Sequence, residues 1–78
     1  MNLLNGNFVL QQAELLAARV TSEVGTNPGL QVDRLFRIVF QRSPTAKERD
    51  AAVKLVEAHA LSSLSRAVLN ANEFLYVD

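Results

Sequence analysis

Two prolines, each beside residues that end or begin helices, constrain the fold of this chain more than any other feature. In the first break, Gly25-Thr26-Asn27-Pro28-Gly29, a glycine suited to a left-handed helix cap precedes a proline that cannot continue a helix. In the second, Arg42-Ser43-Pro44-Thr45, Pro44 disfavours the helical conformation at Ser43, and Thr45 is placed to cap the next segment. The sequence therefore predicts loops at both positions.

The apolar residues on either side of the first break repeat at helical spacing. Between residues 7 and 24 the intervals are three and four, and between residues 30 and 41 the pattern is i, i+3, i+4, i+7, i+8. The two stripes consist of Val9, Ala13, Leu16, Val20 and Val24, flanked by Leu10 and Ala17, and of Val32, Leu35, Phe36, Val39 and Phe40. We therefore predict helices over about 7–24 and about 30–41.

The segment after the second break contains neither glycine nor proline, and it fits two interpretations. Thr45 and Glu48 form a capping box, Thr-x-x-Glu, which marks the start of a third helix. One interpretation continues this helix to the end of the chain. The other places a break near Ala60–Ser62, because serines cluster where a cap would be expected and a helix of about 30 residues would be unusual in so small a domain. We predict the break, and a fourth helix over about 63–74.

The predicted fold class is all-α, a small bundle of four helices whose third and fourth members are separate or, in the alternative, continuous. We expect one domain over residues 1–78, with helix-loop-helix connections at the two proline-marked turns. The predicted core consists of Leu16, Val20, Leu35, Phe36, Val39, Phe40, Val56, Leu64 and Val68. Asp33 with Arg37, and Asp50 with Lys54, are oppositely charged residues four apart and mark exposed faces.

The composition excludes several kinds of site. Eight Lys plus Arg balance eight Asp plus Glu, so the formal charge is zero and long-range attraction to nucleic acid or anionic lipid is not expected. Cysteine is absent, which excludes disulfides, thiolate zinc sites and c-type haem attachment. Every apolar run is shorter than the roughly 18 to 20 residues that span a membrane, and no export signal is evident.

The only candidate catalytic pair is His59 with Ser63, which one helical turn would place side by side as base and nucleophile. No carboxylate is placed to orient the imidazole, and no glycine-rich turn supplies an oxyanion hole. The acidic residues of the third helix alternate with Lys and Arg, as is typical of a solvated face and not of a metal site. We therefore predict no catalytic residue, no metal site and no cofactor.

Nucleic-acid binding is the alternative from another functional class. Five of the eight basic residues fall on the second helix, the turn after it and the start of the third helix: Arg34, Arg37, Arg42, Lys47 and Arg49. This layout is similar to a helix-turn-helix. Glu48 and Asp50 would face phosphates in the first turn of the recognition helix, however, and the turn contains proline. Nucleic acid is therefore the less favoured partner.

Apolar residues also remain at both ends of the chain after the helices are filled. The candidate interaction patch consists of Leu3, Leu4, Phe74, Leu75 and Tyr76. Aromatic and aliphatic side chains in such a patch are typical of an interface. The alternative is that the two ends pack against each other inside the domain.

Three blocks of the chain carry a family resemblance. They are Leu4-Asn5-Gly6-Asn7-Phe8-Val9-Leu10-Gln11-Gln12-Ala13, then Asp33-Arg34-Leu35-Phe36-Arg37 with Arg42-Ser43-Pro44-Thr45, then Leu69-Asn70-Ala71-Asn72-Glu73-Phe74-Leu75-Tyr76-Val77-Asp78. Together they resemble the C-terminal end of the planctomycete-type domain of unknown function found in large proteins with cytochrome c-like domains. Members usually carry Gly-Arg-x-Pro where this chain has Gln41-Arg42-Ser43-Pro44. The missing glycine predicts that the second helix runs through to its last turn without a flexible cap.

The resemblance implies that these residues end a longer protein that is exported or associated with the cell envelope, and it supplies no catalytic residue. We therefore expect a non-enzymatic packing or interaction module. Its partner would be another domain of the parent protein or a separate protein.

Overall fold

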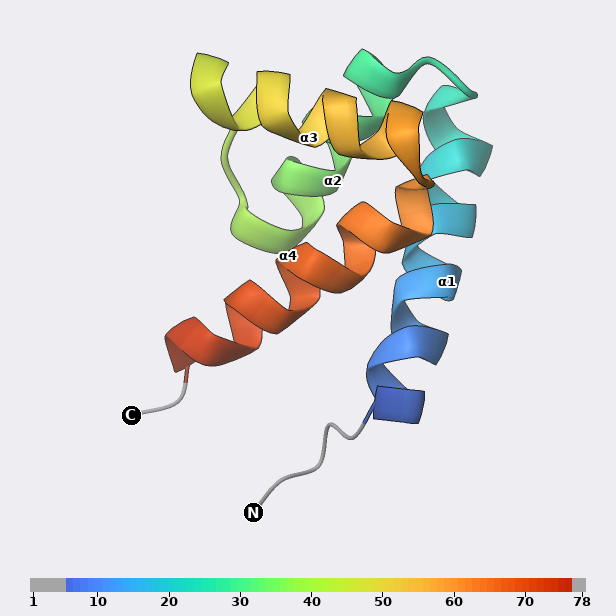
Figure 1. The fold of residues 1–78 in the computed structure, drawn as a ribbon, viewed down its shortest axis with the longest axis vertical. Coiled ribbons are helices and arrows are strands. Elements are labelled where there is room, and N and C mark those ends of the chain that lie inside the picture. Colours follow the sequence, from blue (N-terminus) through green and yellow to red (C-terminus); the bar gives the residue numbers. More distant parts are fainter. Residues whose placement is uncertain (1–5, 77–78) are drawn as a thin grey trace.

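The part of the chain that the structure describes forms four helices, and Figure 1 shows how they are arranged. The computed structural model describes the backbone of residues 6–76 and the side chains of residues 8–71. The helices are α1 (Gly6–Val24), α2 (Pro28–Phe40), α3 (Ala46–Ala58) and α4 (Leu61–Tyr76). The described residues contain no strand. The all-α prediction is confirmed, with α3 and α4 as separate helices.

The helices are arranged so that α2 and α4 occupy the middle of the domain. Each of these two lies beside all three other helices, whereas the backbones of α1 and α3 do not come close to each other within the described residues. In Figure 1, α1 runs along one side, α3 crosses one end, and α4 turns back diagonally from the end of α3. Contacts between α1 and α4 join the first and the last of the described helices.

The first proline-marked break forms as its residues predict. Gly25 adopts φ +82°, the left-handed conformation that glycine accepts without steric cost, and its N–H donates to the carbonyl of Thr21 at 2.8 Å. Asn27 then caps α2, because its Oδ1 accepts from the N–H of Leu30 at 3.1 Å. Pro28 occupies the first turn, where a missing N–H costs nothing. As a result, α2 begins two residues earlier than predicted.

The connection from α2 to α3 corrects one prediction and confirms another. Gln41 lies outside α2 with φ 58° and ψ 33°, and its N–H donates to the carbonyl of Arg37 at 3.1 Å. The sequence predicts that α2 runs through to its last turn without a flexible cap. The helix nevertheless ends in a left-handed cap, because Gln41 takes the conformation that glycine usually supplies. The capping box is confirmed. Thr45 Oγ1 accepts from the N–H of Glu48 at 3.1 Å, and the Glu48 carboxylate accepts from the N–H of Thr45 at 2.8 Å.

The predicted break between the last two helices is confirmed at residues 59–60. His59 ends α3 with φ −125° and ψ −91°, and its N–H donates to the carbonyl of Leu55 at 2.9 Å. Helix α4 begins at Leu61, two residues earlier than predicted, so the serine cluster lies inside its first turns. One of these serines, Ser65, is fully buried, and its hydroxyl donates to the carbonyl of Leu61 at 2.9 Å. That bond satisfies the hydroxyl within its own helix, so burying it leaves no polar group unpaired.

The hydrophobic core contains the predicted residues. Val20, Leu35, Phe36, Leu64 and Val68 are buried, and Leu16, Val39, Phe40 and Val56 pack against them. The buried apolar side chains are Val9, Ala13, Ala17, Val20, Val32, Leu35, Phe36, Ala52, Leu61, Leu64 and Val68. Burial of such side chains supplies most of the stability of a domain this small.

Gln31 is a buried polar side chain that ties the first break to α2. Its Nε2 donates to the carbonyl of Gly25 at 2.7 Å and to Oγ1 of Thr21 at 3.3 Å. Both acceptors lie at the end of α1, so one amide group fixes the angle at which the chain enters α2.

Candidate functional site

The basic residues predicted as a nucleic-acid patch lie on α2, on the connection after it and on α3, and three of the five are ion-paired. These three are Arg34, Arg42 and Arg49. The structure therefore brings acidic partners to most of the predicted patch.

Arg42 is the most highly connected of these arginines. Its guanidinium donates to both carboxylate oxygens of Glu48, at 2.8 and 2.9 Å, and to the carbonyl of Ser43 at 3.1 Å. The same group lies over two rings of α2, 5.8 Å from the centroid of Phe36 and 5.6 Å from that of Phe40. The two rings are themselves tilted against each other, with centroids 5.2 Å apart. Bidentate pairing and stacking together fix the position of a guanidinium more firmly than either contact alone. We call Arg42, Glu48 and the two rings the arginine clasp.

Glu48 is held as an anion in this clasp. The hydrogen bonds from Arg42, followed by the bond from the Thr45 backbone N–H, lower the pKa of Glu48 to about 2. The same pairing with Glu48 raises the pKa of Arg42. A phosphate would have to displace a carboxylate that the protein already holds in two ways, so the clasp is suited to joining α3 to α2.

Two further ion pairs connect helices. Arg34 donates to Glu23 of α1 at 2.7 Å, and Arg19 donates to the same carboxylate at 3.3 Å. These bonds, that of Arg34 first, lower the pKa of Glu23. Arg49 of α3 donates to Asp33 of α2 at 3.0 Å. Asp33 therefore pairs with a residue of another helix. Sequence spacing alone pairs it with Arg37 of its own helix and does not predict this bond.

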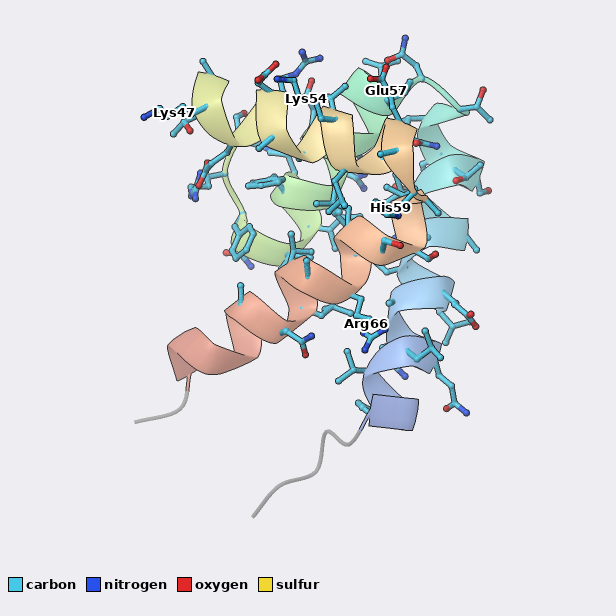
Figure 2. The ribbon with its side chains drawn as sticks, viewed as in Figure 1. Lys47, Lys54, Glu57, His59 and Arg66 are labelled. Carbon is cyan, nitrogen blue, oxygen red and sulfur yellow. The ribbon has the colours of Figure 1, made fainter. Side chains whose placement is uncertain are left out.

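The outer face of α3 carries the remaining charges of that helix. Asp50 and Lys54 pair at 3.2 Å, as predicted, and both side chains are well exposed. Figure 2 shows Lys47, Lys54 and Glu57 pointing away from the bundle. This is the solvated helix face that the alternating charges predict.

His59 and Ser63 do not form the pair that one helical turn would give. Both are exposed, and the break between α3 and α4 separates them. Figure 2 places His59 at the junction of the two helices. Among the described residues, no group of three or more His, Cys, Asp or Glu side chains is placed to hold a metal ion. None of the helices in that part of the chain has the length and apolar character needed to cross a membrane.

The predicted interaction patch of Leu3, Leu4, Phe74, Leu75 and Tyr76 lies outside the described side chains, so it stays a prediction. The described part of the chain has its own exposed apolar residues: Phe8, Leu10, Leu15 and Leu30. Leu15 is 65% exposed, the most of these. It borders an open groove between α1 and α4, lined by Gln12, Leu15, Leu16, Arg19 and Leu69. The sequence carried a signal for Leu15, because this leucine lies beside the predicted α1 stripe and not in it.

Comparison with known proteins identifies the family. No curated protein and no solved structure matches the chain significantly. The family model of PSD1, a protein of unknown function (DUF1553), matches residues 1–56, which cover α1, α2 and most of α3. The closing block, residues 69–78, lies beyond the matched range. Because the match covers more than half of the chain, the resemblance is confirmed, and this chain belongs to the PSD1 family of proteins of unknown function (DUF1553).

Proposed function

We propose that this domain is a non-enzymatic packing or interaction module that docks to another part of a larger protein or to a protein partner. The parent would be an exported or envelope-associated protein of the planctomycete type, with this domain at its C-terminal end. The observation that carries the proposal is the exposed Leu15 beside the groove between α1 and α4.

Leu15 is well suited to be the centre of a docking surface. Its neighbours in the groove include two further apolar side chains, Leu16 and Leu69, and two polar ones, Gln12 and Arg19. An apolar centre with a polar rim is the usual composition of a protein interface. A lone exposed leucine would need no explanation, but leucines from two helices along one groove support an interface.

The terminal patch extends this proposal. Leu3 and Leu4 precede α1, and Phe74, Leu75 and Tyr76 belong to the last part of the chain, where α4 ends. We include these five residues in the proposed docking surface because the groove lies between α1 and α4. The first two precede α1 in the chain, and the other three are the last residues of α4. Packing of the two ends against each other is the competing arrangement.

Cysteine footprinting tests the proposal directly, because the chain contains no cysteine of its own. A Leu15→Cys variant would be labelled with a maleimide in the isolated domain and again within the parent protein. We expect fast labelling in the isolated domain, because residue 15 is exposed there, and slow labelling in the parent, where a partner surface covers it. The measurement is the labelling rate at this position by mass spectrometry.

The matched control is Ala51→Cys, an exposed position on α3, away from the groove. Its labelling rate should be similar in both contexts. Equal rates for the two variants within the parent protein would contradict docking through Leu15.

The nucleic-acid alternative is less well supported because carboxylates hold Arg34, Arg42 and Arg49. Fluorescence anisotropy with a labelled DNA duplex separates the two functions. Binding that weakens steeply with salt would favour the nucleic-acid function, and we expect none at physiological salt.

A further inference from the structure

Helix α3 is much less deeply buried than the other three helices. Among the described side chains, α1, α2 and α4 each bury four, whereas α3 buries only Ala52. Val53, Leu55 and Val56 pack against the core but stay half-buried. Few buried apolar contacts are the mark of a segment that opens at low free-energy cost.

Two ion pairs hold the beginning of α3, at its third and fourth residues, Glu48 and Arg49. The arginine clasp joins Glu48 to the two rings of α2 through Arg42. Arg49 adds a bond to Asp33 at 3.0 Å. All of these charged side chains are partly exposed, so each pair contributes little and is weakened by salt.

The connections on either side of α3 are non-helical. Residues 41–45 separate it from α2, and residues 59–60 separate it from α4. Residues of such connections absorb backbone rotation without breaking a helix. The backbone of α3 does not come close to that of α1 in the described structure, so its movement would leave the packing of α1 on α2 and α4 in place.

We propose that α3 is a strap that opens as a unit while α1, α2 and α4 stay packed, and that the arginine clasp and the Arg49–Asp33 pair set how often it opens. Opening would uncover the part of the core against which Val53, Leu55 and Val56 pack. The open state would lie only slightly above the closed state in free energy, and it would form without a docked partner.

Native-state hydrogen exchange on the intact chain tests the strap, with two variants that each remove one carboxylate. Asp33→Asn breaks the pair that links α3 to α2. Asp50→Asn is its matched control, because Asp50 pairs with Lys54 inside α3 itself, at a similar distance. In the native protein, we expect α3 amides to exchange faster than the slowest amides of the other helices, and faster still in high salt.

Asp33→Asn should accelerate exchange in α3 by roughly two- to fivefold, the range for an exposed ion pair, and leave the slowest amides of α1 unchanged. Asp50→Asn should change the slowest α3 amides less. The proposal is overturned if the slowest amides of α3 and α1 exchange at one common rate, which would mean a single cooperative unit. It is equally overturned if the two variants accelerate α3 to the same extent, because the pair to α2 would then have no special effect.

Discussion

The side-chain amide of Gln31 donates to the carbonyl of Gly25 across the turn between α1 and α2, at 2.7 Å. Gln31 is nearly inaccessible to solvent, while Gly25 adopts a positive φ at the end of α1. A buried polar group therefore holds the angle between two helices, which apolar packing alone leaves less defined.

Replacing Gln31 by leucine keeps the volume but removes this donor. We expect the free energy of unfolding to fall by about 0.5 to 1.5 kcal/mol, the net value of a hydrogen bond, because the exposed Gly25 carbonyl loses its protein partner. Urea denaturation measures the change. Thr21→Ala is the control, since its bond to Gln31 is longer, at 3.3 Å, and should be worth less. A Gln31→Leu variant as stable as the native chain would show that packing, not hydrogen bonding, sets this turn.

Gln41→Gly should make the domain more stable. Gln41 has φ 58°, a conformation that costs a residue with a side chain about 1 to 2 kcal/mol and that glycine adopts freely. We expect a gain of about 0.5 to 1 kcal/mol after the extra backbone entropy of glycine in the unfolded chain is subtracted. Thermal unfolding reports the gain. Gln41→Ala keeps the strain and is the control, so a similar gain in both variants would rule out the backbone explanation.

Phe36→Ala should cost about 3 to 5 kcal/mol, since it removes a buried ring and leaves a cavity. This is a large share of the stability of a small domain, so the variant should be partly unfolded at 37 °C. Leu15→Ala is the comparison at an exposed position and should change stability by less than about 0.5 kcal/mol. Circular dichroism during denaturation measures both. A small effect at Phe36 would place the ring outside the core.

The stability of the domain should fall in acid because of Glu48. Its pKa is lowered from 4.5 to about 2 in the folded chain, so the folded state favours the anion more than the unfolded state does. This contribution is present above pH 4.5 and is lost as the pH falls toward 2. Glu23, whose pKa is also lowered, adds a loss of the same sign.

Glu48→Gln isolates this effect, because glutamine still fits the capping box but cannot ionise. Its urea midpoint should be lower than that of the native chain at pH 7, and the two should converge toward pH 2. Arg42→Gln should flatten the acid dependence in the same way. Parallel pH profiles for native and Glu48→Gln chains would disprove the assignment.

The helices were predictable because their boundaries depend on local chemistry. Gly25, Pro28 and the Thr45–Glu48 box each act within a few residues, and the sequence displays them directly. The left-handed Gln41 was missed because a non-glycine residue gives no signal for that conformation.

The candidate site was less predictable, because its contacts join distant positions. Asp33 lies four residues from Arg37, yet it bonds to Arg49, sixteen residues away, once α3 packs beside α2. Ser65 has the hydroxyl typical of a capping residue, and its burial follows only from the placement of α4. The terminal patch stays a prediction, since its side chains fall outside the described residues.

The separation of α1 from α3 has an energetic consequence. Residues that share no contact and no common partner usually contribute to stability independently. A substitution on the outer side of α1 and one on the outer side of α3 should therefore add, with no coupling energy between them. A substitution in one of these helices then does not directly change the effect of a substitution in the other on stability. Any coupling between them must act through α2 or α4.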